Sequence, residues 1–309
     1  MFAVIFPGQG SQSVGMVKSL YEKFSAVKKI FNRADEVLDY PISKTILEGP
    51  EKDLNLTENT QPAIFLVSYS IFSLIKSEFN LNLNKAKYFA GHSLGEYSAL
   101  ACANSINFEN AIRLLKLRGK SMQSAVPVGE GGMLVILGKE ISEIEKIFKE
   151  NNLENCEIAN DNCPGQVVIS GKASSIQNLN IILKKMSIKN ISLPVSAPFH
   201  CSLMKKATDF MKGEIQKTEF QIPNPNIISN VTALEQNDPE KIKELLIYQI
   251  ESRVKWRESV DFMIKSNIKK FIEIGPGKVL TGLMKRIDRN VESISINNED
   301  DIKKIKIND

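Results

Sequence analysis

The chain has 309 residues, of which 42 % are hydrophobic and 25 % are charged, and its formal net charge is +4. This length allows roughly two domains of about 150 residues, or one large domain with an insert. The ordinary globular composition excludes a disordered or fibrous protein. No apolar run approaches the ~18 residues of a membrane span, and no basic stripe is interleaved with aromatic residues. We therefore expect a globular protein that binds neither membranes nor nucleic acids.

The N-terminal segment and the cysteines bear on the cellular compartment. Residues 2–6 are apolar, but no basic segment precedes them and Pro7 and Gly8 follow, which is not the pattern of a targeting peptide. The four cysteines form no CxxC pair and are too sparse for a disulfide framework. We expect a cytoplasmic protein without a zinc site, with free thiols at Cys102, Cys156, Cys163 and Cys201.

The first part of the chain alternates short apolar runs with longer amphipathic segments, which is typical of an α/β protein. Strands are predicted at 2–6 and 87–90, each followed by a glycine-rich turn. Helices are predicted, in chain order, at 14–24, 27–38, 60–79, 96–101 and 107–125. In the third of these helices Pro62 falls in the first turn, where proline is tolerated.

The composition changes at residues 126–132, whose glycines and proline indicate a hinge. The elements predicted beyond it are, in chain order, a strand at 133–137, a helix at 140–151, strands at 155–160 and 166–170, a helix at 173–186 and a strand at 190–194. The order βαββαβ is the ferredoxin-like signature. We interpret residues 129–194 as a ferredoxin-like subdomain, inserted into a large α/β domain of residues 1–128 and 195–309.

The α/β pattern resumes after this subdomain. Helices are predicted at 203–218, 238–251, 256–267 and 278–288. Strands are predicted at 227–229, 269–274 and 291–296. The tail from Asn297 is polar and charged, and we expect it to be mobile in part.

The most informative motif is residues 91–95, Gly-His-Ser-Leu-Gly, which lies between a predicted strand and a predicted helix. This is the context of a nucleophile elbow, a crowded turn that needs glycine on both sides of the serine. The turn would project the hydroxyl of Ser93 above the sheet edge, and the N–H of Leu94 could stabilise an oxyanion there. The motif favours a catalytic serine over a purely structural turn.

A serine nucleophile needs a base, and the chain has two histidines. His92 is adjacent to Ser93, and the sharp turn would point the two side chains in different directions. His200 lies in the proline-containing loop 196–200, where catalytic residues tend to occur, and is the better candidate. A catalytic triad has a third group, usually a carboxylate, that orients the imidazole. The sequence shows no carboxylate at a recognisable spacing, so a backbone carbonyl or an amide could orient the imidazole instead.

A second turn and an arginine can each be interpreted either as a structural feature or as part of the site. Residues 6–12 form a second glycine-rich turn that lacks the spacing of nucleotide-binding loops. Its exposed N–H groups could supply a second oxyanion donor. Arg118 lies on the predicted helix 107–125 and taken alone is a surface charge, although the preceding leucines allow it to point inward.

Taken together, these segments resemble the malonyl-CoA:acyl carrier protein transacylases of type II fatty acid synthesis. The similarity runs nearly from end to end, with its motifs in the family's order. The matching segments are 6–12, 91–97, 117–120, 162–168, 198–200 and 273–280. The resemblance implies a hydrolase-like α/β domain that carries a ferredoxin-like subdomain, in agreement with the pattern above.

The resemblance also implies roles for individual residues. Ser93 would be the acylated nucleophile and His200 its base, oriented by the main-chain carbonyl of Gln249. Backbone N–H groups of Gln9 and Leu94 would form the oxyanion hole. Arg118 would bind the free carboxylate of a malonyl group, because a planar guanidinium can hold a carboxylate through two parallel hydrogen bonds.

The implied reaction is a ping-pong transfer of malonyl from malonyl-CoA, through a malonyl-serine, to the phosphopantetheine thiol of acyl carrier protein. This carrier is acidic in the family, and the transfer supplies extender units for fatty acid synthesis. No metal or redox cofactor is implied, and the family suggests a monomer. Phe199, next to the predicted base, is a bulky residue that in the family favours malonyl over methylmalonyl groups, or else a simple packing residue. Ser229 departs from the commonest family pattern without touching a proposed role.

Two other functions remain open from the sequence. A serine hydrolase would use the same Ser93 and His200 but resolve the acyl-enzyme with water, releasing free malonate without a carrier. A non-enzymatic carrier-docking subunit would retain the fold but would not become acylated at Ser93.

Overall fold

The structure is a computed structural model that describes residues 1–195 and 197–306. Its larger part is built around a six-stranded sheet with the order β10-β9-β1-β2-β7-β8. All neighbouring strands in this sheet are parallel except the last pair. The strands are β1 (Phe2–Phe6), β2 (Tyr88–Gly91), β7 (Asn226–Ile228), β8 (Glu235–Gln236), β9 (Lys270–Ile274) and β10 (Glu292–Ile296).

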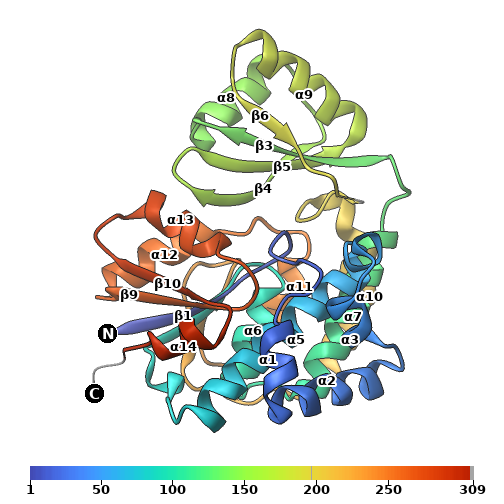
Figure 1. Cartoon of the computed structure of the whole chain (residues 1–309). Coiled ribbons are helices and arrows are strands. Elements are labelled where there is room, and N and C mark those ends of the chain that lie inside the picture. Colours follow the sequence, from blue (N-terminus) through green and yellow to red (C-terminus); the bar gives the residue numbers. More distant parts are fainter. Residues whose placement is uncertain (196, 307–309) are drawn as a thin grey trace.

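Helices surround this sheet and bury it in apolar side chains (Figure 1). The N-terminal helices are α1 (Lys18–Lys23), α2 (Ser25–Leu38), α3 (Ile42–Leu47), α4 (Glu51–Leu54), α5 (Thr57–Glu78), α6 (Gly95–Cys102) and α7 (Phe108–Ser124), with the short 3-10 helix η1 (Leu83–Lys85). The C-terminal ones are η2 (Ser202–Met204), α10 (Lys205–Gln216), α11 (Pro239–Gln249), α12 (Trp256–Lys265), α13 (Val279–Ile287) and α14 (Glu299–Lys303).

A second sheet is formed by the middle of the chain. It has the order β4-β5-β3-β6, built from β3 (Gly131–Leu137), β4 (Cys156–Cys163), β5 (Gln166–Lys172) and β6 (Asn190–Ser192). Helices α8 (Ile141–Glu150) and α9 (Ala173–Lys185) cover its outer face, at the top of Figure 1. The predicted ferredoxin-like order βαββαβ is therefore confirmed. The domain limits at 129 and 194 stay a prediction, while the sheet itself begins at Gly131 and ends at Ser192.

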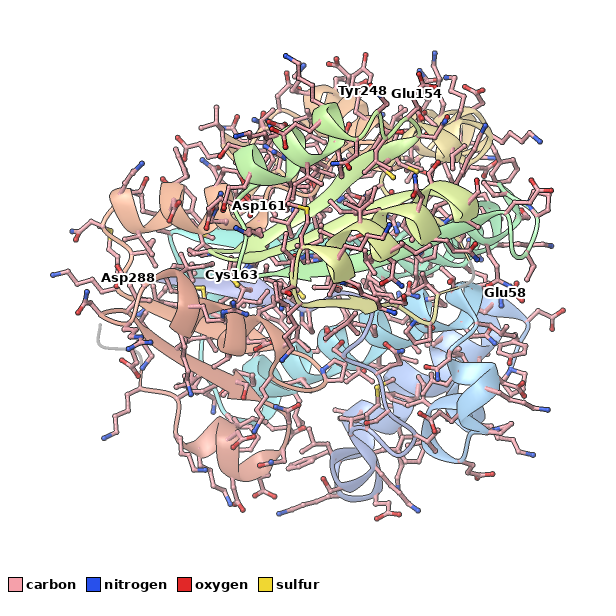
Figure 2. The ribbon with its side chains drawn as sticks, turned by 90° about the horizontal axis from the view of Figure 1, so that it is seen from above. Glu58, Glu154, Asp161, Cys163, Tyr248 and Asp288 are labelled. Carbon is pink, nitrogen blue, oxygen red and sulfur yellow. The ribbon has the colours of Figure 1, made fainter. Side chains whose placement is uncertain are left out.

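The small sheet is fastened to the large domain along β4, which contacts α12 and α13. Asp161 donates its N–H to the carbonyl of Val254 at 3.0 Å, and Val254 donates to Ala159 at 2.8 Å. Figure 2, which looks down on the molecule, labels Asp161 and Cys163 on this strand. Because residues alternate along a strand, the contact of Asp161 with the large domain leaves Asn160 and Asn162 to face the cleft between the domains.

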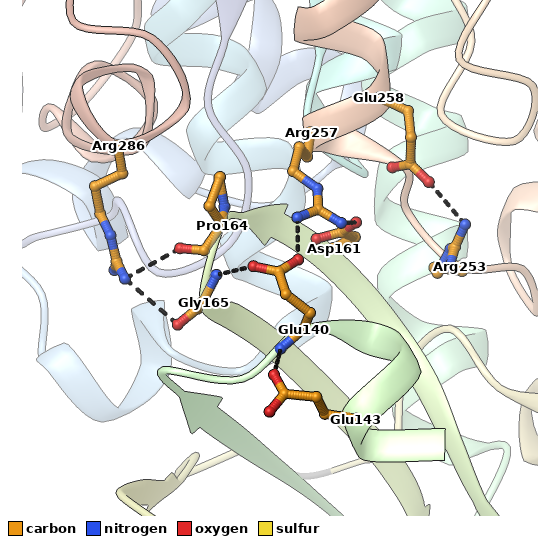
Figure 3. Close-up of polar contacts among 9 residues, drawn as sticks. All are labelled: Glu140, Glu143, Asp161, Pro164, Gly165, Arg253, Arg257, Glu258 and Arg286. Atoms are coloured by element: carbon orange, nitrogen blue, oxygen red, sulfur yellow. Dashed lines mark hydrogen bonds and ion pairs between the residues drawn. The ribbon is translucent and has the colours of Figure 1, made fainter. Parts of the chain in front are cut away.

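Charged side chains reinforce the same junction (Figure 3). Asp161 is fully buried, and its Oδ2 lies 2.8 Å from Nη2 of Arg257, an ion pair whose angles fall outside hydrogen-bond geometry. Arg257 also contacts Glu140, which in turn accepts the N–H of Gly165 at 3.1 Å. The charge of Arg257 thus joins strand β4 and the residue that precedes α8 to helix α12.

Some predicted elements need correction. Helix α5 begins at Thr57, whose N–H donates to Oε1 of Gln123 at 2.9 Å, so Pro62 lies beyond the first turn and not within it. The polar tail from Asn297 forms α14 and buries Ile302. Its last residues, 307–309, lie outside the described residues, as does Ser196 of the predicted catalytic loop. Short elements were not predicted at all, namely α3, α4, η1, β8 and α14.

The remaining sequence predictions concern thiols and membranes. All four cysteines are free thiols, as predicted, and only Cys156 is not fully buried. Within the described chain, no helix combines the length and the apolar character that crossing a membrane would require. In the same residues, no three His, Cys, Asp or Glu side chains gather in a way that could hold a metal ion.

Candidate active site

The carboxyl ends of the parallel strands gather the motifs that the sequence analysis singled out. Strand β1 ends at Phe6 and leads into the turn that carries Gln9, and β2 ends at Gly91 and leads into Ser93. Phe6 and Gly91 are paired partners in the sheet, so the two turns emerge side by side. This edge of an open parallel sheet is where ligands bind in α/β proteins.

Ser93 sits on a strained turn between β2 and α6. Its φ is 53°, a left-handed conformation that is uncommon for a residue other than glycine. A Cβ on Gly91 would lie 1.9 Å from the backbone of Gly95, and one on Gly95 would lie 2.3 Å from the carbonyl of Phe6. Glycine is therefore required on both sides of the serine, as the nucleophile-elbow interpretation predicts.

His200 contacts Ser93 directly. Its Nε2 lies 2.7 Å from Ser93 Oγ, and its Nδ1 lies 2.9 Å from the backbone carbonyl of Gln249. Since a carbonyl only accepts, Nδ1 carries the proton and Nε2 is left to accept from the serine hydroxyl. Within residues 1–195 and 197–306, the group that orients the imidazole is thus this carbonyl at the end of α11. Burial, and then the charge of Arg118, lower the pKa of His200 to about 3, so the ring is neutral at pH 7.

Arg118 points inward, which decides between its two interpretations. The side chain is 1 % exposed, and its Nη2 donates to Ser93 Oγ at 3.2 Å and to Oε1 of Gln249 at 2.9 Å. Its Nη1 donates to Oε1 of Gln61 at 2.7 Å, and the described residues offer Nε no hydrogen-bond partner. All three partners are neutral. Among the described residues no carboxylate contacts this buried guanidinium directly, and its Nε–H is still free to donate.

A close helix contact places this arginine. A Cβ on Gly119 would lie 2.5 Å from the carbonyl of Thr57, so only glycine allows α7 to approach the start of α5 so closely. Gln61, one turn further along α5, then reaches Arg118. The segment 117–120 that the sequence analysis matched to a family motif therefore has a packing requirement beside its charge.

The site opens into a cleft between the two domains. Ser93, His200 and Arg118 line it together with Gln9 and Leu94, the residues predicted to form an oxyanion hole. Leu94 is the N-cap residue of α6, at the end of the helix where backbone N–H groups have no partner within the helix. The apolar part of the wall is formed by Met122, Met133, Val168, Leu193, Val195 and Phe199.

The second histidine points away from Ser93. His92 Nε2 lies 2.9 Å from Oδ1 of Asn162 on β4, and its ring packs against Trp256 at 5.7 Å between centroids. Burial lowers the pKa of His92. This residue therefore ties the elbow to the small domain, and His200 is the histidine in contact with Ser93.

Sequence reasoning from the residues missed the groups that brace the elbow. Asn230 accepts the N–H of Ser93 at 2.7 Å and donates to the carbonyl of Gly91 at 2.7 Å, which fixes both ends of the turn. Glu96 accepts from Asn230 and Gln249. The position of Asn230, just after a strand at the carboxyl edge, was the available signal. Gln249 entered the prediction through the family resemblance alone.

Comparison with known proteins decides the family. The chain matches the acyl transferase domain family over residues 3–304. It is 41 % identical over 305 residues to the malonyl CoA-acyl carrier protein transacylase of Bacillus subtilis, with 97 % of this chain and 94 % of that protein covered. The chain belongs to the acyl transferase family.

Solved structures place this acyltransferase in the same group. It superposes with a TM-score of 0.95 and 40 % identity on the acyl-carrier-protein S-malonyltransferase of Bartonella henselae, covering 98 % of each chain. It superposes with a TM-score of 0.93 and 39 % identity on a malonyl-transacylase in complex with its type II PKS acyl-carrier protein, covering 98 % of this chain and 97 % of that one. The predicted resemblance and the predicted fold class are thereby confirmed.

Proposed function

We propose that this acyltransferase moves a malonyl group from malonyl-CoA to the phosphopantetheine thiol of acyl carrier protein through a malonyl-serine at Ser93. The observation that carries the proposal is one connected arrangement: Ser93 Oγ is within 2.7 Å of a neutral imidazole and within 3.2 Å of a buried guanidinium. The first contact supplies nucleophilic catalysis and the second supplies recognition of a carboxylate.

The first half-reaction forms the acyl-enzyme. Ser93 Oγ attacks the thioester carbonyl of malonyl-CoA while His200 Nε2 takes its proton, and the imidazolium is held by the carbonyl of Gln249. The N–H groups of Gln9 and Leu94 would donate to the oxyanion of the tetrahedral intermediate. The C–S bond then breaks, and CoA leaves as a thiol with the proton from His200.

The second half-reaction reverses these roles. The thiol of the carrier gives its proton to His200 and attacks the ester carbonyl of malonyl-Ser93. The C–O bond to the serine breaks, and Ser93 Oγ regains the proton from His200. The products are malonyl-carrier and free enzyme, so no external oxidant, metal or redox cofactor enters the balance.

Arg118 supports malonyl as the acyl group. A malonyl group carries a carboxylate two carbons from the reacting carbonyl, and Arg118 Nη2 already lies beside Ser93 Oγ. Binding this carboxylate would satisfy the unpartnered Nε and neutralise the buried charge. An acetyl group would leave both unsatisfied.

The expected setting follows the relatives of the chain. We propose an acidic, phosphopantetheinylated acyl carrier protein as the acceptor, a monomeric enzyme, and a cytoplasmic role in supplying extender units for fatty acid synthesis. The relatives named above support the carrier, since their names specify it.

Intact-mass spectrometry after mixing the protein with malonyl-CoA tests the proposal. We expect a gain of one malonyl group that is lost in Ser93→Ala and discharged by holo carrier protein. An unmodified protein that releases malonate and CoA would establish a hydrolase instead. Absence of both adduct and turnover would contradict malonyl-CoA as the donor.

A further inference from the structure

We propose that Glu96 is a positioning residue of the transfer reaction, because it fixes the side-chain amide of Gln249 in the orientation that holds Arg118 beside Ser93. Glu96 does not touch the reacting atoms. It would act through Gln249 on carboxylate recognition and through Asn230 on the elbow. The inference rests on the proposed malonyl transfer and adds a determinant of its selectivity.

Glu96 is buried directly behind the nucleophile. It lies in the first turn of α6 and is 1 % exposed. Its Oε2 accepts two hydrogen bonds, from Nε2 of Gln249 at 2.7 Å and from the backbone N–H of Asn230 at 3.1 Å. This carboxyl oxygen therefore fixes the position of both donors, because leaving a buried N–H group unpaired would carry a desolvation penalty.

The amide of Gln249 has two distinct ends, and its surroundings select one orientation. Its Nε2 end faces two acceptors, Glu96 Oε2 and the carbonyl of Ser93 at 3.0 Å. Its Oε1 end therefore faces Arg118, from which it accepts at 2.9 Å. A flipped amide would point its NH₂ group at the guanidinium, which has only donors, and would leave Arg118 without this acceptor.

Gln249 is thus the residue through which the parts of the site meet. Its backbone carbonyl orients His200, and its side chain joins Arg118 to the backbone of Ser93. The backbone contact survives any rotation of the side chain, whereas the side-chain contacts depend on the two acceptors of Nε2, of which Glu96 is the nearer at 2.7 Å and the Ser93 carbonyl the other at 3.0 Å. Loss of the Glu96 acceptor should therefore disturb Arg118 more than it disturbs the Ser93–His200 pair.

The second bond of Glu96 steadies the elbow. It holds the backbone of Asn230, whose side chain bridges Gly91 and Ser93. Burial raises the pKa of Glu96 to about 7, so near neutral pH both its forms are populated. A protonated carboxyl group still offers an acceptor oxygen, which makes glutamine a fair substitute for it.

Two variants of Glu96 separate its role as a hydrogen-bond acceptor from the space that its side chain fills. Glu96→Gln keeps an acceptor oxygen for both donors, and we expect loading rates within about threefold of wild type. Glu96→Met keeps the size but removes the acceptor. We expect the ratio of malonyl to acetyl loading rates to fall at least about tenfold in Glu96→Met, since a charge-assisted bond that holds the guanidinium is released. Single-turnover loading from malonyl-CoA and acetyl-CoA gives the ratio.

Glu273→Met is the matched control. Glu273 is also fully buried; it lies on β9, and its carboxylate accepts from the N–H groups of Leu280 at 3.0 Å and Thr281 at 2.8 Å in the first turn of α13. Its loss should lower the stability but leave the malonyl-to-acetyl ratio unchanged. If Glu96→Met does not fold, Glu96→Asp asks the same question, because it keeps the charge and withdraws the carboxylate by one methylene.

The outcomes distinguish this inference from the proposed function. If the wild-type protein forms no malonyl adduct, the proposed function fails, and the inference that depends on it fails for that reason. If wild type loads malonyl and Glu96→Met, or Glu96→Asp in its place, keeps the malonyl-to-acetyl ratio or loses both rates equally, Glu96 is structural and the inference is overturned. A reduced ratio that glutamine restores supports it.

Discussion

Replacing Arg118 by methionine is the most direct test of how the site selects its acyl group. Methionine replaces the aliphatic stem of arginine with an unbranched apolar side chain and removes the charge, which leaves a smaller cavity at this 1 % exposed position than alanine would. We expect malonyl loading to fall much more than acetyl loading. The serine and its base remain, because His200 is oriented by a backbone carbonyl that the substitution does not touch.

The size of the effect follows from the donors that Arg118 has available. Each hydrogen bond between charged groups contributes about 1.5–3 kcal/mol, and a carboxylate can take two from one edge of a guanidinium. Nε has no partner within the described residues, but Nη2 must give up part of its contact with Ser93 Oγ at 3.2 Å. The two bonds together contribute about 3–6 kcal/mol, and after subtracting about 1 kcal/mol for that neutral bond, roughly 2–5 kcal/mol remains. This corresponds to a selectivity loss of about 30-fold to a few thousand-fold.

The assay is the single-turnover rate of acyl-enzyme formation with malonyl-CoA and with acetyl-CoA, followed by intact mass. Arg113→Met is the control, because Arg113 lies on the same helix but is exposed. It removes the same net charge away from the cleft and should leave the ratio of the two rates unchanged. Equal losses for both donors in Arg118→Met, or a malonyl-specific loss below tenfold, would refute the carboxylate-binding role.

Three further predictions concern stability. Between pH 6.5 and 4.5 the unfolded chain protonates a histidine that the fold keeps neutral to a pKa of about 3. The free energy of unfolding therefore decreases as the pH falls. Urea titration should show that it decreases by about 1.4 kcal/mol per pH unit more in wild type than in His200→Asn. Parallel plots of unfolding free energy against pH for the two proteins would contradict this. Asp161→Asn should lower the free energy of unfolding by about 1–3 kcal/mol in the same assay. This is less than the usual loss for a broken buried ion pair, because Arg257 keeps its contact with Glu140. An unchanged free energy of unfolding would mean that the Asp161–Arg257 pair does not stabilise the fold. Gly95→Ala should lose at least about 3 kcal/mol or fail to fold, since its Cβ would overlap the carbonyl of Phe6; a stable variant would refute the steric argument.

The parts of the fold that the sequence predicted are those with strong local signals. Strand β1, the elbow and the βαββαβ order are carried by apolar runs that end at glycine or proline, so spacing alone locates them. Helices α3 and α4 have six and four residues, too few to establish a period. Helix α14 was missed because the tail has buried apolar residues at only a few positions, among them Ile302 and Ile305, in an otherwise charged segment.

The site was predictable where one motif carried both position and chemistry, and not where backbone or distant groups act. Ser93 is marked by its flanking glycines, but the carbonyl that orients His200 comes from Gln249, 49 residues away, and any residue type can offer a carbonyl. The direction of the Arg118 side chain was ambiguous, because a leucine-rich helix face does not determine whether a neighbouring residue points inward or toward solvent. Its inward direction is set by Gln61 and Gln249, which belong to two other helices.

The electrostatics of the site connect recognition with catalysis. Arg118 is a buried cation among neutral partners, and after burial its charge is the next cause that lowers the pKa of His200. A carboxylate bound to Arg118 offsets that charge, so the imidazole becomes a stronger base when the acyl group carries the matching anion. An acetyl group leaves the positive charge in place and the base weaker. On the proposed mechanism, the same guanidinium would therefore favour malonyl twice, by binding its carboxylate and by ceasing to oppose protonation of the base that would activate Ser93.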